Sequence, residues 1–194
     1  MEKNLLALLM SYLIGSIPTA LIVSRVLAGV DIRQIGDGNM GARNVTRSLG
    51  WGPGIVVAAF DFSKGGLAVL TARQVGYSLN WQLACGVSAV LGHDFPIFAG
   101  FRGGQGMATT LGTLFVFMPY QTFLGLITFA AAYYLWRSFD FSAATGLGLL
   151  AVFAWISKQP AILVAYTVIL FISIPAKKIL DWPRRRRLAQ GHKQ

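Results

Sequence analysis

The sequence has few charged residues and only one cysteine. Charged residues make up 12% of the 194 positions and hydrophobic residues 55%, whereas average soluble domains carry about 25% charged residues. So little charge in so apolar a chain excludes an ordinary soluble domain. The single cysteine, Cys85, excludes an intrachain disulfide framework and is expected to pack in the core. The two histidines stand far apart and Cys85 has no cysteine partner, so neither a metal site nor a cofactor is expected.

The uncharged stretches predict an all-α membrane protein with about seven transmembrane helices. A helix needs roughly 20 apolar residues to span a bilayer, with about 17 as the lower limit. Residues 103–136 are too long for one span, and Pro119 divides them into two. Residues 52–72 form a span that is interrupted by Asp61 and Lys64. The other predicted spans are 4–24, 74–92, 141–157 and 159–176.

The basic residues predict the orientation of these helices. If the N-terminus is outside, Lys3, Arg73 and Lys158 lie outside and Lys64 lies within a span, which leaves 13 of the 17 Lys and Arg residues inside. Cytoplasmic loops carry such an excess, so the N-terminus is predicted outside and the C-terminus in the cytoplasm. The basic run 184–187 fits a topology signal that also contacts anionic headgroups. Because topology explains the positive charge, nucleic-acid binding is not expected.

The first polar loop spans residues 31–50. Within it, residues 36–44 have the sequence GDGNMGARN, and these nine residues are the first glycine loop. Its glycines have the G-x-G-x-x-G spacing of a dinucleotide-binding turn, which requires a preceding strand. In this sequence a membrane helix, not a strand, precedes the glycine spacing, so NAD binding is excluded. Glycine-exposed N–H groups with nearby amides and guanidinium groups are suited to binding phosphate. The alternative is an interfacial turn whose arginines meet lipid headgroups.

The second glycine loop, residues 93–106, repeats this combination of glycine and basic residues. It begins with His93, which is suited to proton transfer near neutral pH or to a structural hydrogen bond. A third, short polar loop spans residues 137–142. In the predicted topology all three loops lie on the cytoplasmic face. Asp61 and Lys64 lie three residues apart on one helix face, so they are predicted to pair or to contact a ligand.

Over nearly its whole length the sequence resembles the acyl-phosphate-dependent glycerol-3-phosphate acyltransferases of bacterial membranes, the PlsY family. The resemblance rests on GDGNMGARNVTRSLG, on D-x-x-K-G at 61–65 and on GHDFPIFAGFRGGQGMATTLG at 92–112. It implies transfer of a fatty acyl group from acyl phosphate to glycerol 3-phosphate, giving lysophosphatidic acid and phosphate. It also implies a bacterial plasma membrane location, an upstream acyl-phosphate-forming enzyme and a single domain over 1–194.

The residues and the resemblance together indicate a candidate site. Catalytic roles are expected for Asn39, His93, Arg102 and Ser142. The resemblance implies that the hydroxyl of glycerol 3-phosphate is the nucleophile and that the phosphate of the donor accepts its proton. The expected phosphate- or substrate-binding residues are Gly36, Gly38, Gly41, Arg43, Asn44, Arg47, Lys64, Gly103, Gly104, Gln105, Gly106 and Thr109.

Several positions depart from the family pattern. Asp37 stands where a small residue is usual, and Arg43 is a candidate to offset its charge. Gln105 replaces a lysine, Asp140 replaces a serine, and the C-terminus lacks the usual asparagine and glutamate. These departures keep a second function open, a non-enzymatic binding or transport protein for a phosphorylated or lipidic ligand. A transporter is expected to show internal repeats, and none is evident.

Overall fold

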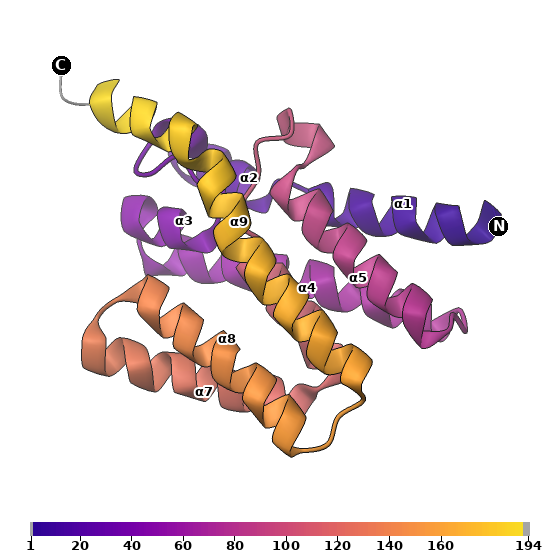
Figure 1. Cartoon of the computed structure of the whole chain (residues 1–194). Helices are drawn as coiled ribbons and strands as arrows, with labels where there is room; N and C mark the ends of the chain where they lie inside the picture. Colours follow the sequence, from indigo (N-terminus) through magenta and orange to yellow (C-terminus); the bar gives the residue numbers. More distant parts are fainter. Residues whose placement is uncertain (1, 192–194) are drawn as a thin grey trace.

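The computed structural model describes residues 2–191, apart from the side chains of 187 and 189–191, and its regular secondary structure in this range is helical (Figure 1). Short 3-10 helices lie in two of the connections, η1 (Ile32–Gln34) and η2 (Ile97–Ala99). The α-helices of the described chain are α1 (Glu2–Ser16), α2 (Thr19–Ala28), α3 (Ala42–Leu49), α4 (Trp51–Gln74), α5 (Leu79–Asp94), α6 (Met107–Phe117), α7 (Pro119–Trp136), α8 (Phe139–Ile156) and α9 (Ala161–Gly191).

Four helical segments of the described chain are long and apolar enough to cross a bilayer. They are Glu2–Ala28, Trp51–Gln74, Phe139–Ile156 and Ala161–Arg186. The first contains both α1 and α2, which are separated at Pro18 because proline has no N–H to continue the helix. The predicted division of 103–136 is confirmed, since α6 ends before Pro119 begins α7. Of the seven predicted spans, these four meet the criterion of length and composition.

Three helix pairs pack closely at glycine residues. Gly92 of α5 lies against the backbone of α1, and Gly112 of α6 lies against the backbone of α4. Between α7 and α8, Gly125 faces the carbonyl of Gly146. A larger side chain at these positions would overlap the neighbouring helix, so small residues set the close spacing, as is common in membrane proteins.

Two buried clusters hold the helices around the predicted loops. Leu114, Leu150 and Leu170 belong to a cluster shared by α6, α8 and α9. A second cluster lies under the first glycine loop and includes Ile32 and Val45. Figure 1 shows α9 running diagonally across the front of the molecule, with its C-terminal part near the connection between α2 and α3. Cys85 is buried, as expected.

Candidate active site

The first glycine loop lies in the connection between α2 and α3 and runs into the first turn of α3. The buried side chain of Asn44 holds it together. The Asn44 Oδ1 atom accepts a hydrogen bond from the Asp37 N–H at 3.1 Å. Its Nδ2 atom donates to the carbonyl oxygens of Ile32, Ile35 and Asn39 at 3.2, 3.0 and 3.1 Å. Because both ends of the amide are occupied within the loop, Asn44 fixes the loop shape instead of facing a ligand.

The charge of Asp37 is neutralised by α9, not by Arg43. The Asp37 Oδ2 atom lies 2.7 Å from Nη2 of Arg185, and its Oδ1 atom accepts the Asn39 N–H at 3.1 Å. Arg43 instead donates to Asp140 at 3.0 Å. The expectation that Arg43 offsets the charge of Asp37 is therefore wrong, because the guanidinium of Arg43 is paired with the carboxylate of Asp140 in α8.

A tight ion pair precedes the first glycine loop and joins it to the second. The Asp31 carboxylate accepts from Nε and Nη2 of Arg33 at 2.9 and 2.6 Å. These side-chain hydrogen bonds lower the pKa of Asp31 from 3.8 to about 2. The Nη1 atom of Arg33 donates across to the Ala99 carbonyl at 3.2 Å. Arg33 therefore links the segment before the first glycine loop to the second glycine loop.

The second glycine loop is shaped by close backbone packing. The Gly104 N–H donates to the His93 carbonyl at 3.2 Å. A Cβ atom on Gly103 would overlap that same carbonyl, and one on Gly104 would overlap Nε2 of the His93 ring. Gly106 has φ +68° and directly precedes α6, so the loop ends at a helix N-terminus. Such a terminus favours negative charge.

Asp61, Lys64 and His93 form a buried polar cluster beneath this loop. The predicted Asp61–Lys64 pair is confirmed, with Lys64 Nζ 2.6 Å from Asp61 Oδ1. Lys64 Nζ also donates to the Ile17 carbonyl at 2.6 Å, where α1 and α2 separate. His93 Nδ1 lies 3.6 Å from Asp61 Oδ1. Both partners of Lys64 are therefore within the protein. Asp61 faces Nδ1 of His93, and Nε2 of the same ring lies against Gly104.

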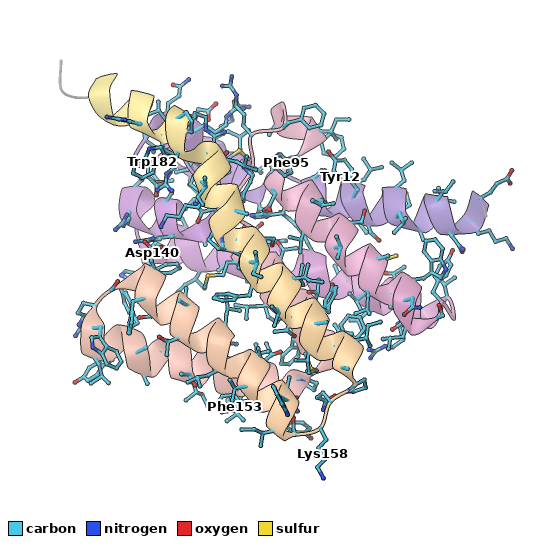
Figure 2. All side chains as sticks on the ribbon, viewed as in Figure 1. Tyr12, Phe95, Asp140, Phe153, Lys158 and Trp182 are labelled. Carbon is cyan, nitrogen blue, oxygen red and sulfur yellow. The ribbon has the colours of Figure 1, made fainter. Side chains whose placement is uncertain are left out.

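The third polar loop joins α3 and α9 through Asp140, which Figure 2 labels at the start of α8. Besides Arg43, the Asp140 carboxylate binds Lys178 of α9 at 2.8 Å. The expected catalytic residue Ser142 is fully buried and donates to the Ser138 carbonyl at 2.7 Å. Ser142 therefore completes a hydrogen bond within the first turn of α8 and lies apart from the cavity described next.

A cavity of about 160 Å³ lies between the second glycine loop, the segment that leads into the first glycine loop, and the end of α9. Arg102 comes from the second glycine loop, Arg33 from the segment before the first, and Arg184 from α9. Asp31, Gln34 and Leu188 complete its lining. Three guanidinium groups and one carboxylate give this cavity a positive charge, which is suited to a phosphate group.

Other predicted residues occupy less direct positions. Arg47 is exposed on α3 and is not part of the cavity lining, while Gln105 is half-buried. Within the described chain, Oδ1 of Asn39 and Oγ1 of Thr109 are buried without a hydrogen-bond partner. These two atoms could bind a ligand that reaches them.

The sequence interpretation missed the contribution of α9. Arg184 lines the cavity and Arg185 pairs with Asp37, whereas the sequence alone assigns the basic run to topology and lipid contact. The side chain of Arg187 lies outside the described residues.

The helices and the cavity define a class: an integral membrane protein with a positively charged cavity beside its glycine-rich loops. The comparisons with known proteins identify the family. A family model described as "Glycerol-3-phosphate acyltransferase" matches residues 5–181, and the chain belongs to this family.

The similarity extends over nearly the full length of known relatives. "Glycerol-3-phosphate acyltransferase 1" of Deinococcus radiodurans is 44% identical over 185 residues, covering 95% of this chain and 89% of that protein. A crystal structure of PlsY (YgiH), an integral membrane glycerol 3-phosphate acyltransferase, in its glycerol 3-phosphate form matches with a TM-score of 0.84 and 29% identity. The lysophosphatidic acid form of PlsY matches with a TM-score of 0.83 and 28% identity. Each alignment covers 97% of this chain and 93% of PlsY.

Proposed function

We propose that this protein transfers a fatty acyl group from acyl phosphate to glycerol 3-phosphate in phospholipid synthesis. The products are lysophosphatidic acid and inorganic phosphate. The observation that carries the proposal is the cavity lined by Arg33, Arg102 and Arg184, between the second glycine loop, α9 and the segment that leads into the first glycine loop. Both proposed substrates carry phosphate, and guanidinium groups bind phosphate with charge-assisted hydrogen bonds. The names of the relatives give the same acceptor, glycerol 3-phosphate.

The proposed reaction requires no nucleophile from the protein. The hydroxyl oxygen of glycerol 3-phosphate attacks the acyl carbonyl carbon, and the bond from this carbon to the bridging phosphate oxygen breaks. The electron pair leaves with phosphate, and the hydroxyl proton passes to the phosphate of the donor. The protein then contributes proximity and stabilisation of negative charge.

The proposed roles follow from where the residues lie. Arg102 and the backbone of 103–106 hold phosphate. Arg47 lies outside the cavity lining, and its assisting role, like that of the first glycine loop, is proposed from the family resemblance. His93 lies behind Gly104 and stabilises the charge that develops beside it, and Asn39 supplies a polar contact. Asn44, Lys64, Arg43 and Ser142 act by positioning these elements, because their polar atoms already have partners within the protein.

The acyl chain of the donor is proposed to stay in lipid beside the second glycine loop. Ile97, Phe98 and Phe101 are exposed there, with 49%, 60% and 58% of their surfaces accessible. An acyl chain that remains in the bilayer reaches the site without leaving an apolar environment. An enzyme that forms acyl phosphate must act before this one.

The membrane arrangement is proposed as seven spans in one domain of a bacterial plasma membrane. The N-terminus would be outside, and both glycine loops would face the cytoplasm. The basic residues of α9 support this orientation, since Lys177, Lys178 and the run 184–187 all follow its apolar part.

The test is acyl transfer by the purified protein in lipid vesicles. Acyl phosphates of several chain lengths and labelled glycerol 3-phosphate are supplied, and labelled lysophosphatidic acid and released phosphate are quantified. We expect equal amounts of both products, and an Arg102→Ala variant that is at least about tenfold slower, because one charge-assisted contact is lost. If the wild type forms no more lysophosphatidic acid than Arg102→Ala does, the enzyme proposal fails. Binding of glycerol 3-phosphate without turnover would then favour the non-enzymatic alternative.

A further inference from the structure

The last turns of α9 lie directly against the first glycine loop. Arg185 pairs with Asp37 through Nη2 and Oδ2, 2.7 Å apart, although the residues are 148 positions apart in the sequence. The side chain of Leu188, one helical turn later, occupies the space that a Cβ atom on Gly38 would need. One ion pair and one apolar contact, both on the same helix face, therefore dock this end of α9 on the loop.

The ion pair with Arg185 neutralises the negative charge of Asp37, which would otherwise oppose anion binding. An isolated Asp37 carboxylate next to Gly36 and Gly38 would repel a phosphate group. Both partners are largely buried, with 23% of the Asp37 side chain and 19% of the Arg185 side chain exposed. The pair is therefore only partly screened by solvent, and its two charges compensate each other.

Docking of α9 also places Arg184 in the wall of the cavity. Its Nη2 atom has a loose ion pair with Asp181, at 3.6 Å, and its Nε atom is buried with no hydrogen-bond partner among the described residues. Arg33 differs, because its guanidinium is bound to Asp31 and to the Ala99 carbonyl. Arg184 therefore brings donors that are still available to the cavity that it shares with Arg102.

We propose that Asp37 and Arg185 are a positioning pair that docks α9 and places Arg184 on the phosphate of glycerol 3-phosphate. This inference rests on the proposed function. The C-terminal helix thus supplies a cation in a protein whose second glycine loop has Gln105 in place of a lysine. Asp37 acts through Arg185 and α9, without touching the substrate.

The first test uses two single variants, Asp37→Ser and Arg185→Ala, and one double variant. The double variant, called the exchange, carries both Asp37→Arg and Arg185→Asp. Each single change is expected to raise the KM for glycerol 3-phosphate about tenfold with a smaller effect on kcat, because Arg184 is displaced. The exchange is expected to restore KM to within about threefold of the wild type, since an ion pair of reversed polarity can form. Arg184→Ala is expected to match the single changes. The control is Arg186→Ala, a change in an exposed neighbour, which is expected to leave KM unchanged.

The sign of the Asp37→Ser effect is the decisive part of this test. If Asp37 only repelled phosphate and had no positioning role, its removal would strengthen the binding of glycerol 3-phosphate and lower KM. A lowered or unchanged KM in Asp37→Ser overturns the proposal, and so does an exchange variant that is no better than the single variants. Thermal denaturation of each variant shows whether the protein is folded, and the exchange remains informative if a single variant is not.

A cross-linking experiment separates this proposal from the proposed function. In a Cys85→Ala background, Asp37→Cys with Arg185→Cys is treated with a short bismaleimide in lipid vesicles, and cleavage between the two positions shows whether they are joined. We expect efficient linkage, and much weaker linkage when Arg186→Cys replaces Arg185→Cys. Linkage without any acyl transfer by the wild type would leave docking intact and reject the proposed enzyme. Acyl transfer without preferential linkage at 185 would reject the docking.

Discussion

The two glycine loops are similar in composition but are built in opposite ways. The first is held by a side chain, Asn44, whose amide makes four hydrogen bonds to the backbone around it. The second is held by its own backbone, which packs so closely on His93 that neither Gly103 nor Gly104 has room for a Cβ atom. Close packing at glycine occurs in both loops, but only the first loop is also held by a buried side-chain amide.

This difference determines how each loop can fail. A loop shaped by a buried amide loses its form when that amide is removed, because several buried carbonyl groups then lack partners. A loop shaped by close packing loses its form when atoms are added. Deleting polar atoms from one loop and adding a methyl group to the other are thus the changes that test the comparison.

The largest effect is expected from Gly104→Ala. The added methyl group would overlap Nε2 of His93, so the loop and the imidazole cannot both keep their positions. We expect kcat/KM for acyl transfer to fall by more than about 100-fold, because small displacements at a reacting centre are costly. Gly148→Ala, at a position where an added Cβ meets nothing within 4 Å, is the matched control. Near-normal activity in Gly104→Ala would show that close packing does not shape this loop.

The next effect concerns the stability provided by Asn44. Replacing it with alanine removes four hydrogen bonds, three of which Asn44 donates to buried or partly buried carbonyl groups. We expect the free energy of unfolding to fall by about 3 kcal/mol, which lowers Tm by roughly 6–12 °C in a protein of this size. Thermal denaturation in lipid nanodiscs measures the shift. A decrease of only about 1 °C would mean that the first loop keeps its shape without the amide.

The smallest effect is the pH dependence of the Asp31–Arg33 pair that precedes the first loop. Arg33 lowers the pKa of Asp31 from 3.8 to about 2. Because the folded-state pKa is the lower one, the pair stabilises the protein above about pH 4, and this contribution is lost as the pH falls from about 4 to 2. The shift corresponds to about 2 kcal/mol. Asp31→Asn is expected to lower Tm at pH 7 by a few degrees, with the difference from wild type vanishing near pH 2. A difference of equal size at both pH values would contradict an ionic origin.

Local sequence patterns predicted the parts of the molecule that depend on neighbouring residues. Pro119 marked the boundary between α6 and α7, because a proline starts a helix easily and interrupts one. The spacing of Asp61 and Lys64 predicted their pair, because residues three apart share a helix face. Arg102 was predicted as a site residue from its glycine neighbours, and it lines the cavity.

The missed features depend on contacts between distant parts of the chain. No local pattern distinguishes Arg185, which binds Asp37, from a basic residue that only meets lipid headgroups. The predicted span ended at 176, but α9 continues through Pro175 and Pro183 to Gly191. Its later turns lie on the first loop and on Asp140, and these contacts favour the helix despite the prolines. The partner of Arg43 was likewise set by α8, not by its neighbour Asp37.

The most direct test of the account is the affinity of the protein for glycerol 3-phosphate, because the central claim is that the glycine loops and α9 form one phosphate site. Calorimetric titration of the protein in nanodiscs compares the wild type with Arg102→Ala and with the exposed control Arg186→Ala. The account predicts a Kd at least about tenfold weaker for Arg102→Ala, the loss expected for one charge-assisted contact, and an unchanged Kd for Arg186→Ala. Equal affinity of all three proteins would contradict it.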